Sequence, residues 1–192
     1  MEPKFRTYTL RLRAEKQDAT RQRIVEATVD LHRTVGPAQT TISAVAEQAG
    51  VQRHTVYRHF PDEATLIKAC ASHFLATNPP PDTGAWGTVA DPVSRLRRGL
   101  TELYSYYAAN QQMITSILRD SAVMPVGGGF RALHEAAFNA LVAGRRGGRR
   151  RIGFTAAVRL ATDFRAWQAL GPPAGLSPSE TADLMCRLLH CL

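Results

Sequence analysis

The sequence predicts an all-α protein of about nine helices, divided into an N-terminal and a C-terminal group. Apolar residues recur at intervals of three and four through most of the 192 residues, which is the spacing of one helix face. No stretch shows the sustained alternation of apolar and polar residues that half-buried strands need. Clusters of proline and glycine separate the helical stretches, so we expect short connections between them.

The N-terminal group is expected to hold four helices behind a polar, basic arm over residues 1–17. Apolar residues at helical spacing predict the first helix over about 18–35, and Gly36-Pro37 ends it. Side chains that cap helices, together with the turn residue glycine, mark the other three. These helices are expected over Thr41–Gly50, over Arg53–His59 and from Asp62 onward.

A proline-rich break over residues 77–91 separates the two groups, because three consecutive prolines and two glycines cannot continue a helix. Asp91 as N-cap and Pro92 in the first turn predict the next helix. The segment Ser177-Pro178-Ser179-Glu180 combines a capping box with a proline and predicts the start of the last helix. Between them, helices are expected at about 110–123, 130–143 and 154–170, and the last one covers 177–191.

Composition limits the classes of protein to consider. The net charge of +8 favours polyanionic partners, although a genome rich in G and C would also raise the arginine content. No apolar run approaches the ~18 residues of a membrane span, and the N-terminus lacks the apolar region of a secretory signal. Three cysteines are too few for a disulfide framework, so we expect a cytoplasmic protein without a membrane partner.

The sequence carries no sign of catalysis. It lacks a nucleophile elbow, a phosphate-binding loop and a dinucleotide fingerprint, so we expect no enzyme and no cofactor. Its six histidines show no metal-ligand spacing with nearby carboxylates or thiols, so we expect no metal site.

The segment 41–60 has the pattern of two short helices joined by a turn at Gly50, which can take a positive φ. Small and branched apolar side chains of both helices can form a seam between them. With Val56 and Phe60 turned inward, His54 and Arg58 point away from that seam. A second helix that projects in this way can enter the major groove of DNA.

The outer face of the second helix carries side chains suited to a duplex. Arg53 and Arg58 can address guanine O6 and N7, because the guanidinium group makes paired hydrogen bonds. Thr55, Tyr57 and His59 offer hydrogen bonds to phosphate. A solvated helix with accidental polarity is the alternative interpretation of this face.

The stretch from Arg23 to about Phe74, and above all GVQRHTVYRHFPDEATL, resembles the DNA-binding domain of the TetR/AcrR family of transcriptional regulators. The resemblance implies that Thr41, Tyr57 and His59 contact phosphates, whereas Ser43, Arg53, His54 and Arg58 face the bases. It also implies a helical C-terminal domain that binds a small molecule and dimerises through its last two helices. We therefore expect an arm at 1–17, a DNA-binding domain at 18–76 with its helix-turn-helix at about 41–60, a linker at 77–91, and a ligand-binding and dimerisation domain at 92–192.

Three positions depart from the family pattern. Gln52 stands where a serine or threonine often caps the recognition helix, Glu63 replaces a lysine that usually contacts phosphate, and His32 replaces an aromatic residue. With one phosphate contact fewer, affinity for DNA is expected to depend more on the basic arm, whose cations include Arg6, Arg11, Arg13 and Lys16.

The C-terminal group offers weaker signals. Large apolar residues with a few polar groups are candidates for a ligand pocket or for plain core packing. These candidates are Phe74, Tyr104, Tyr107, Met113, Ile117, Phe138 and Trp167. Helices 154–170 and 177–191 are expected to form the homodimer contact, through Phe154, Val158 and Ala161 and through Leu184, Leu188 and Leu192.

Together these observations predict a sequence-specific DNA-binding regulator, a homodimeric repressor released from a palindromic operator in double-stranded DNA by a small-molecule effector. The alternative is an arginine-rich helical protein that binds RNA or an anionic surface through the cluster Arg145–Arg151. A mobile, solvated loop is the simpler interpretation of that cluster, and the one we favour.

Overall fold

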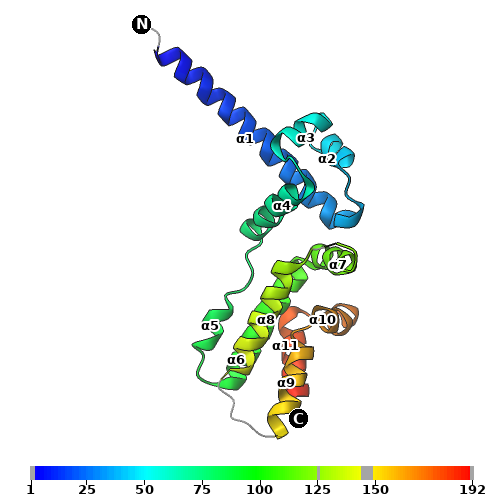
Figure 1. Cartoon of the computed structure of the whole chain (residues 1–192). Coiled ribbons are helices and arrows are strands. Elements are labelled where there is room, and N and C mark those ends of the chain that lie inside the picture. The colour runs from blue at the N-terminus through cyan, green and yellow to red at the C-terminus, as the bar shows by residue number, and fades with distance from the viewer. Residues whose placement is uncertain (1–2, 125, 144–148, 191–192) are drawn as a thin grey trace. The chain divides into compact units, whose positions relative to one another are not determined.

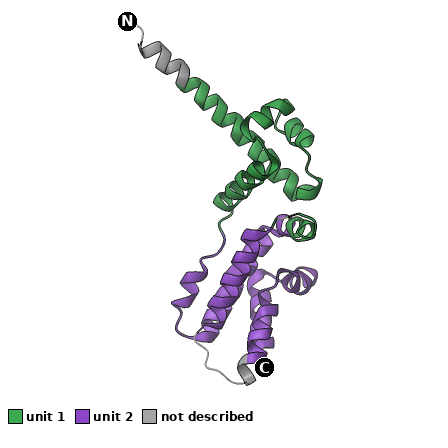
Figure 2. Ribbon diagram, in the orientation of Figure 1, with its two compact units in different colours: residues 1–79, 115–126 green, residues 80–114, 127–192 purple. Residues whose placement is uncertain are grey.

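The computed structural model describes residues 3–124, 126–143 and 149–190. Over these ranges the chain forms eleven α-helices, two 3-10 turns and no strand, which confirms the all-α prediction (Figure 1). The chain divides into two compact units, residues 1–79 with 115–126 and residues 80–114 with 127–192 (Figure 2). No helix within the described ranges is long and apolar enough to cross a membrane.

Unit 1 is built from α1 (Pro3–Thr34), α2 (Ile42–Gln48), α3 (Arg53–His59) and α4 (Glu63–Thr77), with a 3-10 turn at Pro37–Gln39. Its core forms where one face of α1 meets the three shorter helices. The buried apolar residues of this core are Ile24, Val25, Ala27, Val45, Ala46, Ala49, Val56, Phe60 and Leu66.

The structure differs from the flexible arm expected over residues 1–17, because α1 begins at Pro3. No proline or glycine interrupts residues 4–35, and the side chains of residues 11–19 are all exposed. Burial therefore does not hold this segment in helical form. It extends a helix that is anchored from Ile24 onward, and extension of an existing helix needs no new nucleus.

Unit 2 contains α5 (Thr83–Gly87), α6 (Pro92–Ala109), α8 (Gly128–Val142), α9 (Arg149–Ala161), α10 (Phe164–Leu170) and α11 (Pro178–His190). The helix α6 lies at its centre and packs most extensively against α11. One face of α6 is completely buried, through Leu96, Leu100, Leu103, Tyr104 and Tyr107. The helix α7 (Gln111–Asp120) begins in unit 2 and ends in unit 1.

The expected linker over 77–91 contains a helix, α5, that the sequence interpretation lacked. Trp86 in this helix is fully buried, and its Nε1 donates a hydrogen bond of 2.6 Å to Glu102. Gly99 of α6 permits the approach, because a Cβ there would lie 2.6 Å from Leu141 Cδ2 and 3.0 Å from the Trp86 ring. Burial of a large aromatic side chain thus fixes a segment whose composition is that of a loop.

The single helix expected at 154–170 is two helices, α9 and α10. Asp163 ends the first and caps the second, since its carboxylate accepts from the backbone N–H groups of Arg165 and Ala166. The hydroxyls of Tyr104 and Tyr107 each donate a hydrogen bond of 2.7 Å, to the carbonyl oxygens of Ala161 and Thr162. These side chains satisfy carbonyls that the break leaves without a helical partner.

The last helix begins as expected. The hydroxyl of Ser177 accepts from the backbone N–H of Glu180, and the Glu180 carboxylate accepts in return from the Ser177 backbone N–H. This reciprocal pair is a capping box, so the predicted helix start is confirmed.

Candidate nucleic-acid interface

The turn between α2 and α3 is closed by backbone hydrogen bonds that require a glycine. The N–H of Val51 donates to the carbonyl of Ala46 at 2.9 Å, and the N–H of Gly50 donates to that of Glu47 at 3.1 Å. This pair of bonds is a Schellman motif, whose central residue lies in the left-handed region. Gly50 has φ of 64°, so the predicted role of this glycine is confirmed.

An apolar seam holds the two short helices together. Val45, Ala46 and Ala49 from α2 and its C-cap are buried, as are Val56 and Phe60 from α3 and its C-cap. Because both anchors of α3 point inward, this seven-residue helix has a fixed inner face and therefore a fixed outer face.

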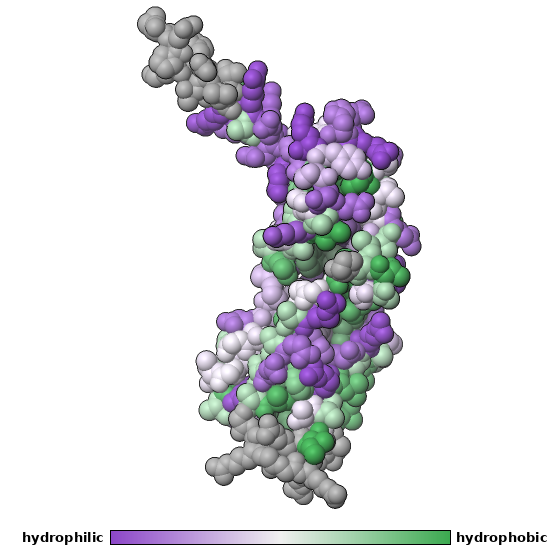
Figure 3. All heavy atoms as spheres, in the orientation of Figure 1, coloured by the Kyte–Doolittle hydropathy of each residue, from purple (hydrophilic) through white to green (hydrophobic). Residues whose placement is uncertain are grey.

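The outer face of α3 is exposed as the sequence predicts. The side chains of Arg53, His54 and Arg58 are exposed, and Tyr57 is 44% exposed. Thr55 and His59 are half-buried on the flanks. Hydrophilic side chains predominate on the surface over this end of unit 1 (Figure 3). The face thus presents two guanidinium groups in a form accessible to a large partner.

The start of each short helix differs in its capping. Thr41 caps α2, since its Oγ1 accepts from the N–H of Ala44 at 3.1 Å, and its hydroxyl proton remains able to donate. Ser43 is exposed in the first turn of α2. Gln52 precedes α3 but makes no side-chain capping bond. Its carbonyl oxygen accepts from the N–H of Thr55 at 2.8 Å, so only the N–H groups of Arg53 and His54 lack a cap.

His59 has an unusual environment at the C-terminal end of α3. Its Nε2 is buried and has no hydrogen-bond partner in the described structure. Burial lowers the pKa of His59, the cations Arg58 and Arg21 lower it further, and Asp18 opposes them. The sequence interpretation missed that α1 supplies Asp18 and Arg21 to this site, because these residues lie some forty positions away in the chain.

The first turn of α4 lies next along the chain from this surface. Asp62 caps α4 as predicted, with its carboxylate accepting from the N–H of Thr65 at 2.7 Å. Glu63 is exposed in that turn, so a carboxylate stands where the family resemblance leads us to expect a lysine.

His32 is part of a polar cluster beneath the interface. It is 7% exposed, and its Nδ1 lies 3.4 Å from Sγ of Cys70. Burial lowers the pKa of His32 to about 4, although the nearby Asp120 opposes the shift. Burial likewise raises the pKa of the Cys70 thiol to about 12. Both side chains are therefore neutral at neutral pH, and the thiol is not reactive.

The end of α7 is bonded to the connection between α1 and α2. Asp120 accepts from the N–H of Ala38 at 2.9 Å, and Arg119 donates to the carbonyl of Val35 at 2.7 Å. Gly36, at φ of 97°, lies under this pair, and a Cβ there would collide with the Arg119 guanidinium. The sequence interpretation assigned no role to either charged residue.

The residues predicted to line a ligand pocket do not form one group. Phe74 and Ile117 belong to unit 1, and the other five belong to unit 2. Tyr104, Tyr107 and Trp167 pack with Phe130 and Phe164 in an aromatic cluster with ring centroids 5.3–6.4 Å apart. Met113 is also buried. These side chains contact one another as a core does.

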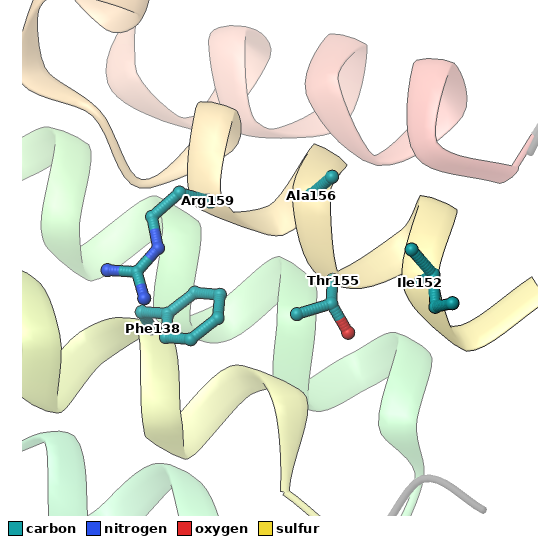
Figure 4. Close-up of a pocket in the computed structure, with 5 residues that line it drawn as sticks. All are labelled: Phe138, Ile152, Thr155, Ala156 and Arg159. Atoms are coloured by element: carbon teal, nitrogen blue, oxygen red, sulfur yellow. The ribbon is translucent and has the colours of Figure 1, made fainter. Parts of the chain in front are cut away.

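A surface depression of about 420 Å³ lies between α8 and α9 (Figure 4). Phe138 is its one lining residue from the predicted set, and the others are Ile152, Thr155, Ala156 and Arg159. The guanidinium of Arg159 lies 3.6 Å from the centroid of the Phe138 ring and also pairs with Glu135.

The face of α9 expected to contact a second chain is turned inward. Phe154, Val158 and Ala161 are buried in the core of unit 2, which corrects that part of the expectation. The apolar side chains that remain outside are Ile152 at 72% and Leu160 at 61% exposure, with Leu188 of α11 at 52%. Leu192 and the arginines at 145, 146 and 149–151 lie outside the described side chains.

Comparison with known protein families finds a match within unit 1. Residues 24–70 match the family described as bacterial regulatory proteins, tetR family. This part of the chain is a TetR-family domain. The TetR-family domain covers α2, α3 and the parts of α1 and α4 that pack on them, and the resemblance seen in the sequence is confirmed.

Two curated relatives, both from Pseudomonas putida, are similar to part of this chain. They are the HTH-type transcriptional regulator TtgR and the probable HTH-type transcriptional regulator ArpR. Each is 40% identical over 55 residues, which is 29% of this chain and 26% of the relative. The match therefore spans about a quarter of these relatives' own length.

Among solved structures, the chain is similar to the crystal structure of RolR in complex with resorcinol. The identity is 18%, the TM-score is 0.42, and the match covers 91% of this chain and 89% of that chain. A likeness at this level supports no conclusion about unit 2.

Proposed function

We propose that this protein is a sequence-specific DNA-binding transcriptional regulator whose helix α3 enters the major groove. The observation that carries the proposal is the exposed face of Arg53, His54 and Arg58 on a helix whose other face is locked into a TetR-family domain. A helix of this kind, projecting from a compact two-helix seam, is the reading element of helix-turn-helix proteins.

Each side chain of the interface has a proposed role. Arg53 and Arg58 bind guanine edges, and His54 and Ser43 contact neighbouring bases. Side chains around the rim bind phosphates and fix the register of the helix on the duplex. These are Thr41, Thr55, Tyr57 and His59, joined by the open N–H groups that follow Gln52.

The protein acts as a homodimer in this proposal. Ile152 and Leu160 of α9 and Leu188 of α11 are apolar and mostly exposed, and burying them against a second copy removes them from water. Two-fold symmetry would present two copies of α3 to successive major grooves, so the operator is an inverted repeat.

A small molecule bound by unit 2 releases the operator in this proposal. The supporting feature is α7, which begins in unit 2 and is bonded in unit 1 to the connection between α1 and α2 through Arg119 and Asp120. A shift along this continuous helix would act on the segment that leads into α2. The effector must bind the two conformations with different affinity, since equal affinity shifts no population.

Selection of binding sites tests the DNA-binding proposal. Purified protein is mixed with duplexes of random sequence, and bound duplexes are recovered and sequenced through several rounds. Enrichment of an inverted repeat, bound much more tightly than random duplex at physiological salt, is expected. Failure to enrich any sequence, with equal affinity for all duplexes, would contradict sequence-specific regulation. Equal or tighter binding of RNA or of anionic lipid vesicles would favour the alternative class.

The effector proposal has its own test. Compounds are screened for an increase in the melting temperature of the protein, and each hit is then added to the complex with the selected duplex. By linkage, an effector that weakens DNA binding by a given factor is itself bound more weakly, by the same factor, in the presence of that duplex. A hit that leaves the affinity for DNA unchanged is a ligand but not an effector.

A further inference from the structure

The N-terminal half of α1 is a solitary cationic helix. Residues 11–19 are exposed on every side, although the helix is continuous from Pro3 to Thr34. No apolar stripe in this segment could dock onto a protein core. Its cations are Arg11, Arg13 and Lys16, followed by Arg21 and Arg23, against the two carboxylates Glu15 and Asp18.

Two of these cations contact other side chains of unit 1. Arg11 pairs with Glu15 at 2.8 Å, and Arg21 lies over the ring of Phe60. Among the residues that the structure describes, no carboxylate pairs with Arg13 or Lys16. The first turn of α1 holds no acidic residue.

The cationic segment begins where the recognition helix ends. Asp18 and Arg21 lie close enough to His59, near the C-terminus of α3, to influence its titration. From there α1 continues toward its N-terminus past α2 and α3 (Figure 1). With a rise of about 1.5 Å per residue, Lys16 and Arg13 lie ~3–8 Å further along its axis than Asp18. The phosphates that border a major groove about 12 Å wide are within reach of such side chains when α3 occupies the groove.

We propose that Arg13 and Lys16 of the α1 extension bind phosphates of the same duplex that α3 reads, and so add a sequence-independent grip beside the recognition helix. This inference rests on the proposed DNA-binding function. It assigns the extension a duplex, and not a membrane or RNA, because Asp18 and Arg21 of the same helix lie beside His59 and Phe60 at the end of α3. Glu63 places a negative charge in the first turn of α4, where it would repel a phosphate. Phosphate contacts made by α1 would compensate for that repulsion.

Salt titration of the double variant Arg13→Gln/Lys16→Gln tests the proposal. Glutamine has a helix propensity close to that of arginine and lysine, so α1 stays helical. The matched control is Arg33→Gln/Arg165→Gln, which removes the same charge from exposed positions at the other end of α1 and in unit 2. Affinities for the selected duplex and for random duplex are measured from low to high salt for all three proteins.

The expected result is a smaller salt dependence for the double variant alone. Each cation that no longer contacts a phosphate lowers the slope of log affinity against log salt by about 0.9. The slope should therefore fall by up to ~1.8 for each bound protomer, and equally on both duplexes, because phosphate contacts carry no sequence information. The control should keep the wild-type slope.

Three other outcomes would overturn the proposal. Equal slopes for the wild type and the double variant would mean that the extension does not contact DNA. The proposed function would still stand in that case, provided that the wild type binds the selected duplex. A loss of binding to anionic lipid vesicles or to RNA, without a change on duplex DNA, would assign the segment to that partner. If the wild type bound no duplex at all, the proposed function and this inference would both fall.

Discussion

The guanidinium of Arg21 in α1 lies 4.7 Å above the ring centroid of Phe60, the residue that ends α3. Phe60 is 1% exposed, because its ring packs in the core of unit 1 and the Arg21 guanidinium covers one of its faces. The contact therefore links α3 to α1 directly, without passing through α2.

Arg21→Ala should lower the free energy of unfolding of unit 1 by about 0.5–1 kcal/mol, the contribution of a cation–π contact at an exposed site. Chemical denaturation followed by circular dichroism measures the change. Arg23→Ala removes the same charge two residues away and is the control, expected to lie within ~0.5 kcal/mol of the wild type. Equal effects of the two variants would show that the contact adds nothing to stability.

Arg58→Ala and Tyr57→Phe should affect DNA binding in different ways. Loss of a guanidinium that binds a guanine edge should reduce the preference for the selected sequence, at a cost of about 1–3 kcal/mol on that sequence. Loss of the Tyr57 hydroxyl should weaken binding to selected and random duplexes alike. Competition binding with both duplexes measures the two effects. If the two variants lost the same affinity on both duplexes, the assigned roles would be wrong.

Gly50→Ala should destabilise unit 1 by roughly 1–2 kcal/mol, because alanine resists the φ of 64° at this turn. A Cβ at this position meets nothing within 4 Å, so the cost comes from backbone conformation alone. Gly153→Ala is the matched control, since it also has open space but lies inside α9. There alanine should stabilise by ~0.5–1 kcal/mol. Thermal and chemical unfolding measure both changes.

His32 should make the protein less stable as the pH falls from about 6.5 toward 4. Within this range an unfolded His32 binds a proton and the folded one does not, since its folded pKa is about 4. The unfolded state thus binds more protons than the folded state. The free energy of unfolding therefore decreases as the pH is lowered, by roughly 3 kcal/mol between pH 6.5 and pH 4.

Chemical denaturation at several pH values checks this prediction with His32→Gln, a neutral polar replacement. The variant should lose most of the pH dependence, and His59, whose pKa is also lowered, should account for part of the remainder. A His32→Gln variant with the full pH dependence would locate its source elsewhere.

Leu160→Glu should convert the proposed homodimer to a monomer, because it places a charge in the apolar contact of α9. Light scattering coupled to gel filtration should give twice the chain mass of 21.1 kDa for the wild type and the chain mass for the variant. Leu75→Glu is the control, since Leu75 is an exposed leucine of unit 1. A wild-type protein that elutes as a monomer would argue against the dimer.

The sequence predicted the helix-turn-helix well because its signals are local. Thr41, Gly50, Asp62 and the inward pair Val56 and Phe60 each carry their meaning within a few residues, and each lies as expected. The outer face of α3 followed from helical geometry alone.

Features that depend on distant contacts were not predictable. The residues around Trp86 have the composition of a loop, and burial of Trp86 against α6 and α8 stabilises their helix, although the capping residue Asp82 was a local signal. The environment of His32 depends on Cys70 and Asp120, which lie far along the chain. Asp163 was a signal that could have been used, since an N-cap residue inside a helical pattern can mark a break.

The aromatic residues of the C-terminal half show that residue type alone does not distinguish a ligand pocket from a core. Tyr104, Tyr107 and Trp167 have the residue types of a ligand pocket and of a core, and periodicity does not separate the two. Their tyrosine hydroxyls are bound to backbone carbonyls at the end of α9, which no sequence pattern indicated.

Both tryptophans of the chain, Trp86 and Trp167, are buried in unit 2, and unit 1 contains neither. Tryptophan fluorescence, excited selectively above the tyrosine absorption band, is therefore a reporter of one unit alone, whereas far-ultraviolet circular dichroism follows the helices of both. Denaturation curves recorded by the two methods would superimpose only if the units unfold as one cooperative block. A separation between the curves would give the stability of the DNA-reading half without any need to cut the chain.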